Sequence, residues 1–376
     1  MQKKFLAGLT TTAFLRRHWQ KRPLLARQAL PDYAAMLDRK TLFELAARDD
    51  VQSRLVMRQR GRWQVAHGPF TKRALARLPR TGWTLLVQGV NHVVPEAGEL
   101  LQRFAFIPYA RLDDIMVSYA PAGGGVGPHF DSYDVFLLQL AGTRRWRISA
   151  QRDLALVDGA PLRILRRFRP QHEWLLAPAD MLYLPPRYAH DGIAVDECLT
   201  CSIGFRAPSA QELGSHFLEF LQDRLALEGR YRDPDLEPQR HPAQLGPAML
   251  QQMQHMVARI RWRERDVAQF AGQFLTEPQP HIVFDRPSRP LTSAIFAARA
   301  RRDGVRLALK TRMLYRGHRI FINGECCETR GERVLLRLAD RRFLPPRTPL
   351  GAEAGNWLYR WYCCGYVELG CGPGYR

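Results

Sequence analysis

The chain has 376 residues, of which 46% are hydrophobic and 24% charged, a balance that excludes an intrinsically disordered chain and suits two or three domains. No apolar run approaches the ~18 residues of a membrane helix, which excludes a membrane-spanning protein. The 56 Lys and Arg residues outnumber the 36 acidic residues, giving a net charge of +20 that would attract nucleic acid or an RNA-rich particle, although a generically basic surface explains it equally well.

The first 110 residues alternate helical patterns with short strands. Three threonines at 10–12 cap a predicted helix that runs to Trp19 and ends before Pro23. Apolar runs at 85–87 and 93–94 predict short strands. The segment before the helix lacks the apolar core and cleavage site of a secretory signal, so we expect a cytoplasmic protein.

From about residue 113 to 206 the pattern changes to short β-rich runs separated by Gly and Pro. Strands are predicted at 115–119, 135–140, 145–148, 181–184 and 199–205, which indicates a β-sandwich or barrel. Helices are then predicted at 212–227 and 247–274. The remainder predicts a helix at 291–302, a hairpin of 306–315 with 318–323 turning near Gly317, and a final helix followed by a strand.

The seven cysteines do not form a recognisable framework. Cys198 and Cys201 lie in an apolar strand-like run, which favours burial over metal binding. The adjacent pairs at 326–327 and 363–364, with Cys371 nearby, lack the spacing of zinc sites. We expect reduced thiols.

The residues with the clearest chemical meaning lie in the β-rich segment. A glycine-rich run at 123–127 precedes His129 and Asp131, whose side chains would share a face if they lie on a strand. His190 follows a Pro-Pro turn much later in the chain. Two imidazoles and one carboxylate are the facial triad that binds Fe(II). A His-x-Asp pair alone is also typical of ordinary turns, so the prediction of a metal site rests on the ordered set.

The segment 127–136 (GPHFDSYDVF), followed by RRWR at 144–147, resembles the JmjC-type cupin oxygenases that use Fe(II) and 2-oxoglutarate. The segments 19–25 (WQKRPLL) and 204–208 (GFRAP) resemble one branch of them, the bacterial ribosomal oxygenases. This resemblance implies a mixed α+β chain. Residues 1–208 would form a double-stranded β-helix (cupin/JmjC) oxygenase domain with an N-terminal extension, 209–277 a helical dimerisation domain, and 278–376 a winged-helix-like domain.

The resemblance also implies roles for individual residues. His129, Asp131 and His190 match the iron ligands, and Arg144 matches the residue that pairs with the distal carboxylate of 2-oxoglutarate. A guanidinium suits that carboxylate because it donates two parallel hydrogen bonds. Alternation places Arg145 and Arg147 on the opposite face from Arg144 and Trp146, and the resemblance selects Arg144.

Two further residues are weaker candidates. Ser118 aligns with a position that lines the cosubstrate or substrate pocket, although it also suits a satisfied edge hydroxyl. Tyr133 lies an even number of residues from His129 and Asp131, so on a strand its ring would face the cavity with them. There it would either stack on a guanidinium or pack as part of the barrel lining. Three carboxylates that could attract an arginine substrate are Asp113, Asp114 and Asp134.

The implied activity is hydroxylation, with O2, of the β-carbon of one arginine of a large-subunit ribosomal protein by a homodimeric enzyme. We expect no sequence-specific DNA binding by the C-terminal segment, because fold alone does not establish function. The residues leave three alternatives open: a JmjC-type protein demethylase, a non-catalytic basic protein that binds rRNA, and a cupin sugar isomerase.

Overall fold

A computed structural model describes residues 5–370, which form two compact units. The first contains the described residues up to Ala207, together with Pro278–Thr311 and those from Arg337 onward, and the second contains Pro208–Glu277 and Arg312–Leu336. The C-terminal segment predicted as one domain thus contributes to both units, and the three-domain division stays a prediction. Cys371 lies outside the described residues. Among residues 5–370, no helix is long and apolar enough to cross a membrane.

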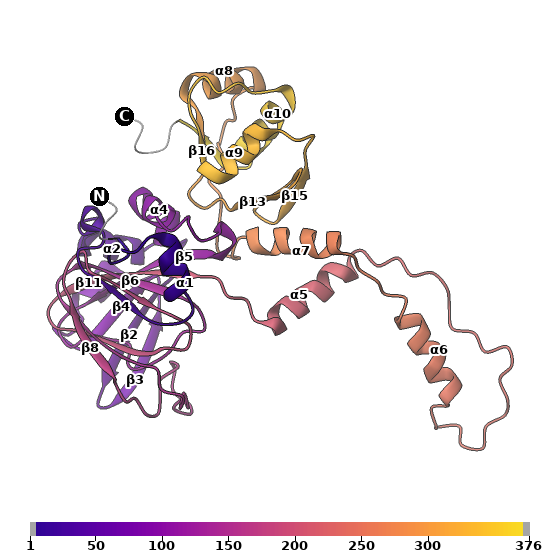
Figure 1. Ribbon diagram of the computed structural model, residues 1–376, viewed down its shortest axis with the longest axis horizontal. Coiled ribbons are helices and arrows are strands. Elements are labelled where there is room, and N and C mark those ends of the chain that lie inside the picture. Colours follow the sequence, from indigo (N-terminus) through magenta and orange to yellow (C-terminus); the bar gives the residue numbers. More distant parts are fainter. Residues whose placement is uncertain (1–4, 371–376) are drawn as a thin grey trace. The chain divides into compact units, whose positions relative to one another are not determined.

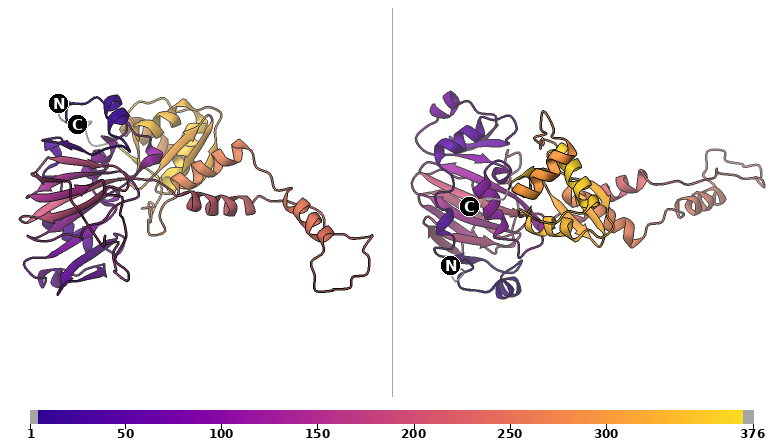
Figure 2. Two further views of the ribbon diagram at one scale, coloured as in Figure 1. Left: turned by 60° about the horizontal axis from the view of Figure 1, so that its bottom comes forward. Right: turned by 90° about the horizontal axis from the view of Figure 1, so that it is seen from above.

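The first unit is built around a β-barrel of two sheets (Figures 1 and 2). The eight-stranded sheet has the order β1-β9-β6-β11-β5-β4-β2-β3, and the three-stranded sheet has the order β10-β7-β8. The strands of the large sheet are β1 (Leu24–Ala26), β2 (Ser53–Gln59), β3 (Arg62–His67), β4 (Trp83–Val87), β5 (Leu112–Ala120), β6 (Val135–Ala141), β9 (Met181–Leu184) and β11 (Cys198–Phe205). The strands of the small sheet are β7 (Arg144–Ser149), β8 (His172–Leu176) and β10 (Ala189–Ala194).

Antiparallel pairing sets the register across the barrel. β5 pairs with β11 so that Ser118 lies opposite Thr200, and β7 pairs with β10 so that Ile148 lies opposite His190. All five strands predicted between residues 113 and 206 are present, as is the one at 85–87. The strand predicted at 93–94 is wrong. Val90–His92 form a short 3-10 helix there, and Val93 caps it.

The N-terminal segment closes one side of the barrel. Helix α1 (Thr11–Arg17) begins after Thr10, whose hydroxyl accepts the Ala13 amide, as the threonine run predicts. β1 then pairs with β9 at the edge of the large sheet. Phe14 is fully buried against Phe136 and Tyr183, so this segment belongs to the barrel core. The other helical turns of this region are η1 (Pro31–Tyr33), α2 (Arg39–Ala46), α3 (Lys72–Ala76), η2 (Val90–His92), α4 (Pro95–Gln102) and η3 (Tyr109–Arg111).

The C-terminal part of the first unit combines α8 (Ser293–Asp303) and α10 (Ala352–Cys363) with a sheet ordered β16-β12-β17. The strands are β12 (Val305–Leu307), β16 (Phe343–Leu344) and β17 (Val367–Leu369), and α9 (Arg333–Arg341) spans the division between the units. The predicted final helix and strand are therefore confirmed. Trp361 is fully buried in α10.

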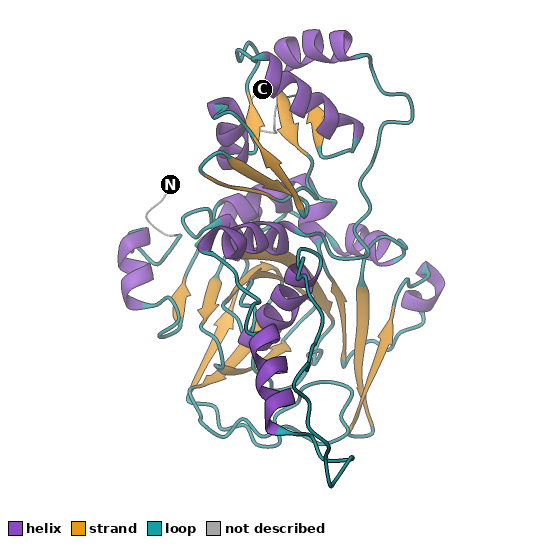
Figure 3. Ribbon diagram, turned by 90° about the vertical axis from the view of Figure 1, so that its right-hand side faces the viewer, coloured by secondary structure: helices purple, strands orange, loops and turns teal. Residues whose placement is uncertain are grey.

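The second unit contains three helices and a three-stranded sheet, shown by element type in Figure 3. The helices are α5 (Ala210–Gln222), α6 (Pro247–Val257) and α7 (Glu264–Thr276), and the strands are β13 (Met313–Arg316), β14 (Arg319–Ile322) and β15 (Glu325–Glu328). The single helix predicted at 247–274 is two helices. The hairpin turn at Gly317 is confirmed, but its first strand begins at Met313, because residues 305–307 pair elsewhere.

Candidate metal centre and its cavity

A backbone bridge between two distant segments brings two histidines side by side. His129 and His190 are directly opposed, and each backbone amide donates to the other's carbonyl, at 2.9 and 2.8 Å. Their rings consequently lie 4.2 Å apart between centroids. His190 lies on β10. Apart from the bridge at His129, the segment from His129 to Asp131 is a loop, so the expectation that these two residues lie on one strand is wrong.

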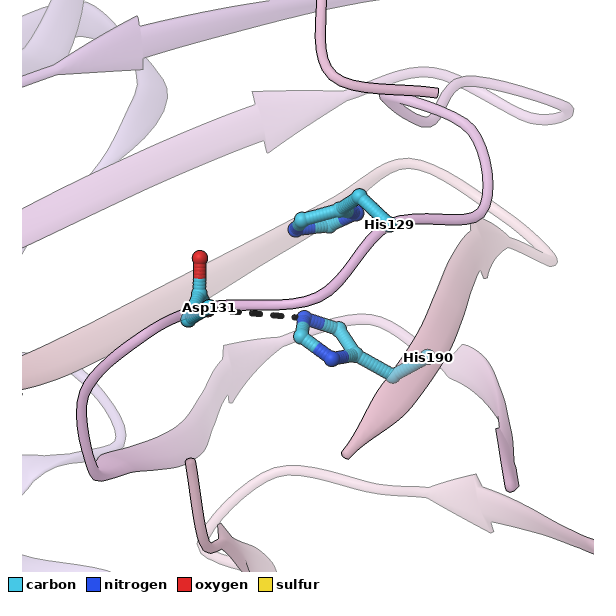
Figure 4. Close-up of side chains that lie close together, drawn as sticks. All are labelled: His129, Asp131 and His190. Atoms are coloured by element: carbon cyan, nitrogen blue, oxygen red, sulfur yellow. Dashed lines mark ion pairs between the residues drawn. The ribbon is translucent and has the colours of Figure 1, made fainter. Parts of the chain in front are cut away.

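Asp131 completes the cluster in spite of its loop position (Figure 4). Its carbonyl accepts the Arg187 amide at 2.7 Å, which fixes the loop. One carboxylate oxygen lies 3.7 Å from Nε2 of His190. Ligand atoms of His129, Asp131 and His190 all lie within 4.8 Å of one another. This is a compact set of two nitrogens and one oxygen donor.

Hydrogen bonds orient both imidazoles for metal binding. Nδ1 of His129 lies 2.9 Å from the Gly127 carbonyl, and Nδ1 of His190 lies 2.8 Å from the Tyr188 carbonyl. Because a carbonyl only accepts, each Nδ1 carries the proton and each Nε2 keeps its lone pair. Burial, and then the neighbouring His129, lower the pKa of His190 to about 4 against the opposing effect of Asp131. Neutral imidazoles and a carboxylate fit a divalent transition metal.

The cluster lies in a cavity of about 460 Å³ inside the barrel, and Arg144 lines the same cavity. Arg144 is 3% exposed and donates to Oγ of Ser118 at 3.0 Å, to Oγ1 of Thr200 at 3.2 Å and to the Gly192 carbonyl at 3.2 Å. Its Nε is buried without a partner, and burial lowers its pKa. A buried cation among neutral acceptors fits an anionic ligand.

The other two arginines of the run do not reach this cavity. Alternation along β7 leaves Arg144 and Trp146 buried and Arg145 and Arg147 half-buried, as expected from the sequence. Arg147 instead pairs with Asp191 at 2.5 Å. Arg144 is therefore the guanidinium of the run that lines the cavity.

The remaining candidates differ in position. Ser118 lines the cavity on β5, and Tyr133 lines it from a loop, where it is 41% exposed. Burial, followed by the charges of Asp131, Asp114 and Asp113, raises the pKa of Tyr133, so these carboxylates are close to its hydroxyl.

Asp113 and Asp114 also line the cavity, whereas Asp134 does not belong to its lining. Asp134 is fully buried and accepts hydrogen bonds from the Tyr183 hydroxyl at 2.6 Å and the Gln20 amide at 3.0 Å. It therefore anchors the N-terminal segment to the barrel rather than facing a substrate.

Sequence reasoning missed Thr200 and Gln139. The Thr200 hydroxyl donates to Oε1 of the fully buried Gln139 at 2.9 Å while it accepts from Arg144. Only the pairing of β11 with β5 and β6 brings these side chains together, and no local motif reveals that pairing.

Comparisons with known proteins agree with this geometry. Residues 99–213 match the family described as JmjC domain, and residues 252–355 match the ROXA-like winged helix. Ribosomal protein uL16 3-hydroxylase of Escherichia coli (strain K12) is 35% identical over 316 residues, which are 83% of this chain and 84% of that protein. The X-ray structure of E. coli YcfD has a TM-score of 0.84 at 32% identity, covering 96% of this chain and 98% of that one. YcfD, a ribosomal oxygenase from Escherichia coli, in complex with cobalt and 2-oxoglutarate, matches with a TM-score of 0.81.

Proposed function

This chain belongs to the ribosomal oxygenases, JmjC-type 2-oxoglutarate-dependent dioxygenases that use Fe(II) and O2, and we propose that it hydroxylates the β-carbon of one arginine of the large-subunit ribosomal protein uL16. The observation that carries the proposal is a single cavity that contains both a cluster of metal-binding side chains and a buried cation. The donor atoms of His129, Asp131 and His190 lie within 4.8 Å of one another, and Arg144 lines the same cavity as a buried cation that forms no ion pair with a carboxylate of residues 5–370. The name of the E. coli relative supports uL16 and the 3-position, which is the β-carbon.

The chain's own residues would divide the work as follows. His129, Asp131 and His190 hold the metal, and their tautomers are set before it binds by the Gly127 and Tyr188 carbonyls. The metal and 2-oxoglutarate would supply the oxidative chemistry, in which 2-oxoglutarate is converted to succinate and CO2 while one oxygen atom of O2 enters succinate and the other forms the new hydroxyl group. Arg144 and Ser118 bind the distal carboxylate of 2-oxoglutarate.

The acidic wall of the cavity supports a cationic side chain as substrate. Asp113 and Asp114 line it together with Tyr133, and Asp114 is only 8% exposed. The guanidinium of the target arginine would find a carboxylate there and an aromatic face on Tyr133. The Tyr133 hydroxyl is a donor at neutral pH, because the ordinary pKa of a tyrosine is about 10 and burial and these carboxylates raise the pKa of Tyr133.

The helices of the second unit support a homodimer. No residue of α6 is buried, and α5 and α7 also expose large apolar side chains. Residues 209–277 contain eight Arg and ten acidic residues, a net charge of −2 in a chain of +20, so two copies could meet here without strong repulsion. The exposed large apolar side chains of residues 209–277 are Leu218, Leu225, Leu227, Leu236, Leu245, Leu250, Met253, Val257, Trp262 and Val267.

Light scattering of the purified chain tests the dimer. Replacing Met253 and Val257 with Asp puts charge on the apolar face of α6 and should give a monomer, whereas Asp at Gln251 and His255 of the same helix should leave the mass unchanged. A monomeric wild-type protein would refute the proposal. The absence of sequence-specific DNA binding and the cytoplasmic location stay predictions.

Two experiments test the activity. Anaerobic titration of the metal-free protein with Fe(II) and 2-oxoglutarate should give a weak visible charge-transfer band that needs both additions and is absent from His129→Ala. Incubation with uL16, 2-oxoglutarate and O2 should then add one oxygen to an arginine, located by fragmentation mass spectrometry. Formaldehyde from a methylated peptide, without hydroxylated uL16, would favour the demethylase alternative.

A further inference from the structure

Eight arginines lie on two segments that both reach the catalytic cavity, and we call them the arginine rim. They come from two segments that are far apart in the sequence, the β2–β3 hairpin and the loop between β7 and β8. Its members are Arg54, Arg58, Arg60, Arg62, Arg163, Arg166, Arg167 and Arg169. All are exposed except Arg54, which is half-buried.

The two segments meet beside the metal cluster. Arg54 and Arg163 both line the catalytic cavity. A Cβ added to Gly127 would lie 2.6 Å from the Trp63 ring of β3 and 3.0 Å from Ile164 of the β7–β8 loop, so both segments touch the glycine turn before His129. The Leu165 amide also donates to the Pro128 carbonyl at 2.8 Å. The rim is thus one surface next to the site. Figure 1 shows β2 and β3 within the barrel.

The rim carries charge that the protein leaves largely uncompensated. Arg166 pairs with Asp158 at 2.8 Å. For the other seven rim arginines, no ion pair with a carboxylate is found in residues 5–370. Like charges on neighbouring segments repel one another, so a surface with this excess of arginine favours a polyanionic ligand.

Aromatic rings lie among these arginines. The guanidinium of Arg58 lies 5.5 Å from the centroid of the Trp63 ring, and that of Arg163 lies 5.0 Å from the Phe130 ring. Both rings are half-buried, so part of each remains accessible. Guanidinium groups that contact phosphates, combined with aromatic faces on which bases stack, are typical of surfaces that bind single-stranded RNA. An acidic peptide would use the charges but not the rings.

We propose that the arginine rim binds RNA, with phosphates on its exposed guanidinium groups, beside the mouth of the catalytic cavity. RNA affinity does not depend on the proposed hydroxylation, and it is measured without turnover. If uL16 is the substrate, as proposed above, RNA bound to the rim would reduce the repulsion between this basic surface and a basic ribosomal protein. The enzyme would then engage its substrate together with RNA.

Fluorescence anisotropy of the full-length protein with a fluorescein-labelled 20-nucleotide single-stranded RNA tests this, at 50 to 200 mM salt. The rim variant replaces Arg60, Arg62 and Arg167 with Ala, since none of these lines the cavity. The control replaces three exposed arginines at and after α1, next to β1, which lies at the opposite edge of the large sheet from β3, and thus removes the same charge. These are Arg16, Arg17 and Arg22.

We expect the rim variant to bind RNA at least tenfold more weakly than wild type at 50 mM salt, and the control less than threefold. The slope of log K against log salt should shrink by about 2 in the rim variant, roughly 0.7 for each lost phosphate contact. Retained binding of Fe(II) and 2-oxoglutarate verifies that the rim variant is folded. Equal losses in both variants, no RNA binding by wild type at 50 mM salt, or rim-dependent binding of a poly-glutamate peptide without RNA binding would each overturn the proposal.

Discussion

The variant Arg144→Met should weaken the binding of 2-oxoglutarate without lowering the stability of the ligand-free fold. The guanidinium is 3% exposed and bonds three neutral oxygens, and its Nε has no partner. Met keeps much of the length and volume of the side chain but removes the charge. Loss of two charge-assisted hydrogen bonds to the distal carboxylate, at about 1.5–3 kcal/mol each, predicts at least a hundredfold weaker binding of 2-oxoglutarate.

The metal-free, ligand-free protein should respond quite differently. Removing a buried cation relieves a desolvation penalty of several kcal/mol, which opposes about 1 kcal/mol for each acceptor left without its donor. We therefore expect little loss of stability in the absence of ligand. At a ligand concentration of about 100 Kd, wild-type protein gains about 2.7 kcal/mol, whereas a hundredfold weaker site gains about 0.4 kcal/mol.

Differential scanning calorimetry with Mn(II), with and without 2-oxoglutarate, measures both quantities without turnover. Arg145→Met is the matched control, because Arg145 is the next residue of β7 and lies on the opposite face. The cosubstrate should raise the Tm of wild type and Arg145→Met but not of Arg144→Met. A full Tm shift in Arg144→Met would show that another cation holds the diacid.

Three further predictions concern other residues. Gln139→Leu removes the acceptor that orients the Thr200 hydroxyl, so the KM for 2-oxoglutarate should rise about tenfold in steady-state assays with little change in kcat; a lower kcat at unchanged KM would argue against this role. Gly272→Ala places a Cβ 2.3 Å from the Phe321 ring, so it should lower the free energy of unfolding of the second unit by about 1–3 kcal/mol in urea titrations. The control Gly214→Ala lies in α5, where the added Cβ has nothing within 4 Å, and should raise this free energy slightly. In the metal-free protein, His190 takes up a proton near pH 6.5 in the unfolded chain but only near pH 4 in the folded protein. The free energy of unfolding should therefore fall by about 3 kcal/mol as the pH drops from 6.5 to 4. The variant His190→Gln should lack this part of the decline.

The sequence predicted six of the eleven barrel strands, because runs of apolar and β-branched residues are a local property. In β7 the buried and half-buried residues alternate as expected. The sequence did not predict β1, β2, β3, β8 or β10. The errors elsewhere have non-local causes. Val93 and Val94 have high strand propensity, but no strand of residues 5–370 pairs with them, and the chain turns through η2 into α4. The hairpin strand predicted at 306–315 included residues 306–307, which belong to β12 and pair with β17.

For the candidate site, too, local motifs were predictable from the sequence and contacts set by strand register were not. A motif with fixed spacing brought out His129 and Asp131, although the parity argument behind it assumed a strand that is a loop. Thr200 carries no motif, and its contact with Arg144 depends on the register of β11 against β5. Asp134 resembled the other carboxylates in sequence, and its bonds to Tyr183, Gln20 and Arg111 in the structure distinguish it.

Charges of both signs line the cavity, and this has a consequence for binding. Arg144 is a buried cation, and the carboxylates Asp113 and Asp114 line the same cavity. An arginine side chain that enters before the diacid meets the charge of Arg144. Once the diacid neutralises Arg144, this repulsion is removed while the attraction of the carboxylates remains. Electrostatics alone therefore favours 2-oxoglutarate binding before the protein substrate.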